Sequence, residues 1–137
     1  MSALVARQEP YRALQVFDSV PAGHTAILIE HDRWAPHLNA GEFAVIDVED
    51  KSRERGELYV YLLERSSLHK RQIEILPTII QICTRGFGGD DSGVWMRFEW
   101  KRPGQRNYVD GPLRFEYWPE KCAGRVVGVL VPARVAA

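Results

Sequence analysis

Short apolar or alternating segments recur along the chain, separated by glycine, proline and charged residues, and this pattern predicts strands rather than helices. The alternation is regular in VWMRFEWK (94–101), where Val94, Met96, Phe98 and Trp100 share one face. The segments expected to form strands are 25–30, 42–48, 57–64, 70–76, 79–84, 94–101, 113–118 and 124–132. A further segment, 13–19, suits either a short strand or a helical turn. We therefore expect an all-β fold of eight or nine strands, with strongly bent sheets and hairpins and little helix.

The length of 137 residues suits a single domain over 1–137. Residues 1–20 have the mixed character of an N-terminal arm, and RSSLH (65–69) suits a hairpin loop. RPGQRNYVDGP (102–112) is expected to be a turn region, so residues 84–118 form an aromatic hairpin region.

The charge balance limits the classes of partner. Eighteen basic and eighteen acidic residues give a formal charge of zero, whereas a general nucleic-acid-binding protein needs a basic surplus. Nucleic acid is therefore an unfavoured partner. No apolar stretch is long enough to span a bilayer, and the N-terminus lacks a signal-peptide pattern, so we expect no membrane association. Cys83 and Cys122 are expected to be reduced, mostly buried thiols of a cytoplasmic protein, with a disulfide as the less favoured alternative.

An ordered series of short motifs runs through residues 25–76. ILIE is followed by Asp32-Arg33-Trp34-Ala35-Pro36, then Gly41-Glu42 before FAVID, which ends at Asp47, and Gly56-Glu57 before LYVYLLE. Near the end of the chain, Gly124 and Gly128 belong to the segment Gly124-Arg125-Val126-Val127-Gly128-Val129, which looks like a Gly-x-Val-x-Gly-x-Val strand. This series resembles the peptidase domain of the LexA and lambda-repressor type, which is related in fold to bacterial signal peptidase. The resemblance covers 25–76 and, more loosely, 122–133, and residues 84–118 have no counterpart in it.

The resemblance implies a serine nucleophile and a lysine base, and this sequence departs from both. Arg33 occupies the serine position, and a guanidinium is permanently protonated and cannot act as a nucleophile. Lys70 is the nearest candidate for the lysine, but it stands at the start of a predicted strand. We therefore expect no catalytic residue, with Arg33 and Lys70 as members of a degenerate site. The plain structural role for Arg33 would be an ion pair with Asp32 or Glu42.

Metal and cofactor sites are not expected. His24, His31, Asp32 and His37 lie close together in sequence, but their spacing matches no zinc motif and better suits turn and surface histidines. The adjacent aspartates at 90–91 lack the further oxygen ligands of a calcium loop.

Aromatic and basic residues alternate in the 84–118 region, and core or dimer packing is the favoured interpretation of the aromatic ones. Trp95 and Trp118, however, have the opposite parity to the expected core face. If they are exposed, they would mark an interaction surface. With the basic residues of the predicted turn they form a candidate surface: Trp95, Trp118, Lys101, Arg102 and Arg106.

The sequence thus favours a non-catalytic binding or regulatory module of the LexA peptidase type. The resemblance implies a bacterial or phage-derived cytoplasmic protein that forms a homodimer and acts on an unidentified protein partner. One alternative is a divergent serine–lysine self-cleaving peptidase in which Ser66 or Ser67 meets Lys70. Another is a nucleic-acid-binding β module that uses the 94–118 hairpin.

Overall fold

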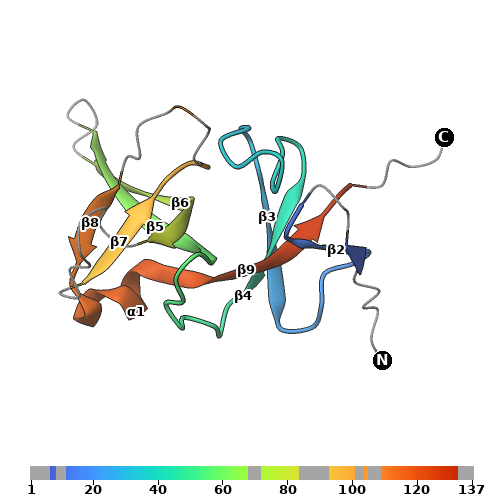
Figure 1. Cartoon of the computed structure of the whole chain (residues 1–137). Coiled ribbons are helices and arrows are strands. Elements are labelled where there is room, and N and C mark those ends of the chain that lie inside the picture. Colours follow the sequence, from blue (N-terminus) through green and yellow to red (C-terminus); the bar gives the residue numbers. More distant parts are fainter. Residues whose placement is uncertain are drawn as a thin grey trace.

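The described residues of a computed structural model form one nine-stranded sheet with very little helix (Figure 1). Described are residues 7–8, 12–67, 72–83, 93–100, 104 and 109–132. The strands are β1 (Arg7–Gln8), β2 (Gln15–Phe17), β3 (His24–Leu28), β4 (Phe43–Asp47), β5 (Leu58–Ser67), β6 (Gln72–Cys83), β7 (Val94–Arg97), β8 (Asp110–Leu113) and β9 (Cys122–Leu130). A 3-10 turn, η1 (Phe115–Tyr117), leads into the short helix α1 (Trp118–Lys121). The prediction of an all-β fold is confirmed.

The molecule has two halves, one formed by β5 to β8 and α1 and the other by β2, β3 and β4, and strand β9 runs through both (Figure 1). Its first residues pair with β5, and its later residues pair with β4 on one edge and with β2 on the other. The strand order is β1-β2-β9-β5-β6-β7-β8, and the β3–β4 hairpin joins this path through β4 and β9. Bulges interrupt the β4–β9 and β5–β9 ladders. Because bulges increase local twist and bend strands, they allow one continuous sheet to extend through both halves of the molecule.

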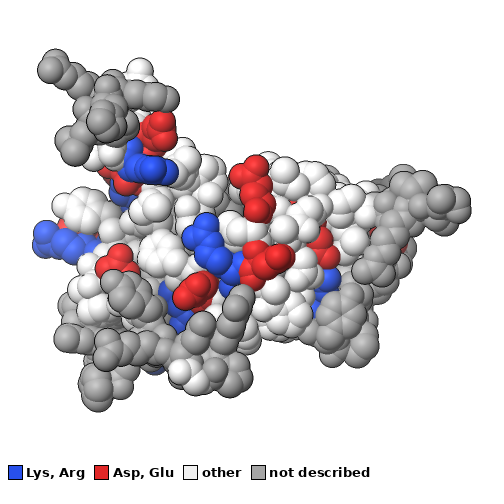
Figure 2. All heavy atoms as spheres, turned by 90° about the horizontal axis from the view of Figure 1, so that it is seen from above, with Lys and Arg blue, Asp and Glu red and all other residues white. Residues whose placement is uncertain are grey.

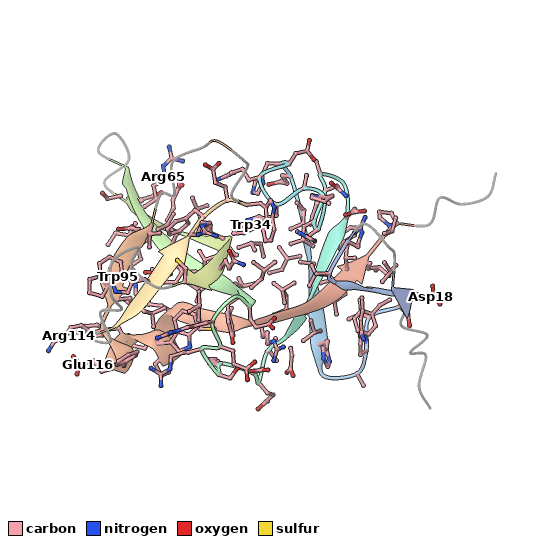
Figure 3. The ribbon with its side chains drawn as sticks, in the orientation of Figure 1. Asp18, Trp34, Arg65, Trp95, Arg114 and Glu116 are labelled. Carbon is pink, nitrogen blue, oxygen red and sulfur yellow. The ribbon has the colours of Figure 1, made fainter. Side chains whose placement is uncertain are left out.

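Two clusters of buried side chains fill the core. The larger one includes Trp34, Ile46 and Val129, and the smaller one lies under β6, β7 and α1 and includes Tyr59 and Trp118. Figure 3 shows Trp34 between the two halves. Most residues of both clusters come from strands, and β4, β6 and β7 each bury three or more consecutive residues, so parts of these strands are covered on both faces.

Two glycines of β9 allow the close packing that this path requires. Gly124 has a φ of +139°, and a side chain there would collide with the backbone of Asp47. A side chain at Gly128 would collide with the ring of Phe17. Both positions therefore exclude larger residues for reasons of packing, independent of any chemistry.

The structure corrects the expected separation of residues 70–76 from 79–84. A single strand, β6, runs through both segments, with Pro77 opposite Leu62 of β5. Proline cannot donate a backbone hydrogen bond and is confined to strand edges. At Pro77, β6 pairs only with β5 among the described strands, so this proline fits without interrupting the sheet.

The predicted strand over 113–118 is wrong, as is the predicted turn over the last residues of 102–112. Strand β8 ends at Leu113, and the chain then turns into η1 and α1. Pro119 lies in the first turn of α1, where its fixed φ and missing N–H are tolerated. The buried indole of Trp118 donates a hydrogen bond to the carbonyl oxygen of Lys51. This anchor and the proline outweigh the alternation of Leu113, Phe115 and Tyr117.

In the described part of the chain, no helix has the length and apolar character needed to cross a membrane.

Candidate functional site

The turn from 31 to 42 carries the residue that replaces the expected nucleophile. The side chains of Trp34 and Leu38 are fully buried and attach the turn to the larger core cluster. The carboxylate of Asp32 accepts a hydrogen bond from the backbone N–H of Ala40 at 2.9 Å, which closes the turn. Gly41, at the end of the turn, has a φ of +90°, which glycine adopts without strain.

A buried ion pair holds the end of this turn. Arg12, whose side chain is 1% exposed, donates to both carboxylate oxygens of Glu42 at 3.0 and 2.8 Å. The Glu42 carboxylate also accepts hydrogen bonds from the backbone and side-chain amides of Asn39. The Arg12 guanidinium reaches the carbonyl oxygen of His37 as well. A bidentate, charge-assisted pair of this kind fixes both distance and orientation.

His37 connects the turn to two other segments. Its Nδ1 accepts a hydrogen bond from the backbone N–H of Ala13, and its ring lies edge-on to Trp100 at 4.5 Å. The backbone N–H of Trp100 in turn donates to the carbonyl oxygen of Arg33. Burial, assisted by the nearby charge of Arg12, lowers the pKa of His37. The neutral imidazole is therefore favoured, as the hydrogen bond to Nδ1 requires.

A groove of about 220 Å³ lies between the end of β3 and the middle of β6. Its described lining is mostly apolar, and Glu30, His31 and Arg33 supply its charged and titratable side chains. Burial and the charge of Arg33 lower the pKa of His31. The described lining is Ile27, Leu28, Ile29, Glu30, His31, Arg33, Val60, Leu76, Pro77, Thr78 and Ile79.

Two strand edges flank this groove. Among the described residues, β3 pairs with β4 alone, and residues 72–80 of β6 pair with β5 alone. From β3 the sheet passes through β4, β9 and β5 to β6, and each of these pairings is antiparallel. Four reversals give β3 and β6 the same sense along this path of pairings. One additional strand placed between them could therefore be antiparallel to both.

The structure separates Arg33 from the carboxylates expected to pair with it. Asp32 is engaged by Ala40, and Glu42 is engaged by Arg12. Arg33 is exposed and lines the groove. Lys70, the other candidate of the degenerate site, lies outside the described residues, so its place beside Arg33 stays a prediction.

The remaining residues of the resemblance have structural roles. Gly56 has a φ of +82° in the turn before β5, while the carboxylate of Asp47 accepts a hydrogen bond from the backbone of Glu49. Glu57 lies 3.5 Å from Arg125, which also contacts Asp50 and Glu54. Pro36, in the 31–42 turn, is exposed.

The proposed aromatic surface is wrong for both tryptophans. Trp95 is 9% exposed and Trp118 is 1% exposed. The ring of Trp95 packs against β8 at Gly111, where a larger residue would collide with it. Figure 3 shows Trp95 beside β8. Alternation predicted an outward side chain, but β8 and α1 cover that second face. Lys101, Arg102 and Arg106 lie outside the described residues.

Charges on the described surface are mixed. Figure 2 shows acidic and basic side chains interspersed over one face, without an extended patch of either sign. The exposed ring of Phe115 is covered on one side by the Arg53 guanidinium, 4.4 Å from the ring centre. Within the described residues, no three His, Cys, Asp or Glu side chains gather to form a metal site, and both cysteines are free thiols. Burial raises the pKa of Cys122 to about 11.

Sequence reasoning missed Arg12, which it had assigned to an arm, and it missed the groove. A charged residue between a tyrosine and an apolar run carries no local signal of burial. Searches against protein-family models, curated proteins and solved structures found no match for the chain.

Proposed function

We propose that this protein is a non-catalytic polypeptide-binding module, related to the LexA-type peptidase domain, that holds an extended segment of another protein between β3 and β6. The observation that carries the proposal is the groove flanked by the edges of β3 and β6, which have no further strand partner there among the described residues. The protein acts in the cytoplasm of a bacterium or derives from a phage, as the resemblance implies.

Strand edges and apolar pockets together suit an extended ligand. Unpaired backbone N–H and C=O groups bind a peptide main chain, and pockets between them select alternate side chains. Leu28 is 47% exposed and Leu76 is 37% exposed, and both line the groove. An inserted strand would cover these side chains and could pair with both edges except at Pro77, which has no backbone N–H.

The chemistry of the lining supports binding without cleavage. No serine or lysine occurs among the described residues of the groove. Arg33 supplies a fixed positive charge where the related peptidases have a nucleophile, and that charge can hold a ligand but cannot attack a peptide bond. This favours a binding module over the divergent peptidase.

The homodimer remains part of the proposal. Ile73 is 69% exposed and Ile75 is 59% exposed, on the same face of β6. Exposed isoleucines at alternate positions of a strand suit an interface between copies. Sedimentation at high micromolar concentration tests this part, and a monomer there would contradict it.

The test of the groove uses a labelled octapeptide of alternating valine and threonine, acetylated and amidated, in fluorescence polarisation. We expect saturable binding and slower amide exchange at residues 25–28 and at Leu76, Thr78 and Ile79. Leu76→Asp places an uncompensated charge in the groove and removes apolar contact, so we expect at least about tenfold weaker binding. Val48→Asp is the matched control, because Val48 is 38% exposed and lies outside the described groove lining.

Binding that is absent in the wild type, or equally weakened in both variants, would contradict the proposed function. Thermal unfolding of each variant confirms that the fold is retained before binding is compared.

A further inference from the structure

Arg33 has a fixed backbone and an exposed side chain. Its N–H donates to His31 Nδ1 at 3.3 Å, and its carbonyl oxygen accepts from the N–H of Trp100 at 2.8 Å. The next residue, Trp34, is fully buried in the core. Arg33 therefore lines the groove from a backbone whose position is set by three contacts, and such preorganisation lowers the cost of binding a ligand.

The charge of Arg33 is not used within the described fold. Three carboxylates are nearest to Arg33 in sequence: Glu30, Asp32 and Glu42. Asp32 is engaged with the backbone of Ala40, and Glu42 is engaged with Arg12. Glu30 lines the same groove, but among the described residues no ion pair joins it to Arg33. By contrast, Arg125 is surrounded by three carboxylates.

We propose that Arg33 is the specificity residue of the groove and binds a carboxylate of the ligand. This inference rests on the proposed function. Guanidinium and carboxylate form short, charge-assisted hydrogen bonds, often two at once. The partner is thus a protein segment with an aspartate or glutamate beside a run of alternating apolar residues.

The direction of the strands places that acidic residue. Arg33 follows the C-terminal end of β3, and a ligand strand antiparallel to both β3 and β6 has its N-terminal end there. The acidic residue therefore precedes the apolar run. The ligand's apolar side chains then lie along Ile27 and Ile79, which line the groove from its two sides.

Three octapeptides test this inference. The first has aspartate at the second position of the valine–threonine sequence, the second has asparagine there, and the third has aspartate at the penultimate position. We expect wild-type protein to bind the first about five- to tenfold more tightly than the second, in keeping with a charge-assisted hydrogen bond at a partly exposed site. The third peptide should bind like the second.

Arg33→Gln should abolish the preference for aspartate, so that the aspartate and asparagine peptides bind this variant with equal affinity. Glu30→Gln removes a negative charge from the same groove, so it should increase the preference for the first peptide over the second about twofold. Arg33→Lys should retain part of the preference, because a lysine keeps the charge without the planar fork.

The outcomes are distinguishable. If all three peptides bind the wild type and Arg33→Gln with equal affinity, the role of Arg33 is overturned and the groove stands. If the third peptide is the preferred one, the orientation is overturned. If no peptide binds the wild type, the proposed function fails and this inference fails with it.

Discussion

Two segments of the molecule are each anchored by one buried tryptophan, yet they are held in different ways. The turn 31–42 has Trp34 in the core, but its shape depends on the buried ion pair between Arg12 and Glu42. The segment 114–121 has Trp118, whose indole donates to the carbonyl oxygen of Lys51, and its own ion pairs, Arg114–Glu116 and Lys121–Glu64, are partly or largely exposed. The ion pair between Arg12 and Glu42 holds the turn that carries Arg33 at the end of the groove. The segment 114–121 instead stabilises the loop that contains Lys51. The comparison predicts that damage to the first segment impairs binding and that damage to the second impairs stability alone.

The largest expected effect comes from removing each tryptophan. Trp34→Ala and Trp118→Ala should each lower the free energy of unfolding by about 3–5 kcal/mol, since both create a large cavity. At a temperature where both variants are folded, Trp34→Ala should also lose peptide binding in the groove, while Trp118→Ala should keep it. Urea unfolding and fluorescence polarisation measure the two effects. Equal loss of binding in both variants would remove the distinction between the segments.

A somewhat smaller effect is expected from the ion pair. Arg12→Met leaves the Glu42 carboxylate buried without its partner, which should cost about 3 kcal/mol of unfolding free energy. The double variant Arg12→Met with Glu42→Leu removes the stranded charge and should recover part of that loss. Peptide binding should stay weak in both variants, because the turn that carries Arg33 is no longer held. Arg114→Met, at an exposed ion pair with Glu116, is the control and should change stability by less than about 0.5 kcal/mol.

These two segments also show how far sequence reasoning reaches. The strands were predictable because alternation reports burial on one face, and the glycines at 41 and 56 were predictable because turns need a positive φ. The segment 114–121 was misassigned because alternation continued past Leu113, while the deciding anchor, Lys51, is remote in sequence. Local patterns carry no information about such a contact.

The candidate site was predictable only in part. Arg33 stood out because it replaces an expected serine, and it does line the groove. The groove itself requires residues 27–33 and 76–79 to lie close together, which depends on four successive strand pairings. Arg12 and Glu42 are thirty residues apart, and neither type of residue is ordinarily buried. Their pairing depends on the fold of the whole sheet, and no local sequence motif predicts it.

The smallest expected effect is a pH dependence confined to the charged turn. The pKa of His37 is lowered, first by burial and then by the charge of Arg12, so the unfolded chain binds its proton more readily than the folded one. The stability that neutral His37 contributes is therefore complete above pH 6.5 and is lost as the pH falls from there through the lower folded-state pKa. Protonation also removes the acceptor for the Ala13 N–H and places a cation beside Arg12, with Glu42 as the facing carboxylate.

We accordingly expect the free energy of urea unfolding to fall between pH 7.5 and 5.5, with a shallower slope in His37→Gln. The same range should accelerate amide exchange in residues 31–42 more than in 114–121, a segment that contains no histidine. His31→Gln is the matched control. The pKa of His31 is also lowered, but its ring accepts a hydrogen bond from the N–H of Arg33, whereas His37 accepts one from the N–H of Ala13. If His37→Gln keeps the full slope and His31→Gln loses it, the pH sensitivity belongs to the groove rim. The contacts of His37 with Ala13 and Arg12 would then not be the source of the pH dependence.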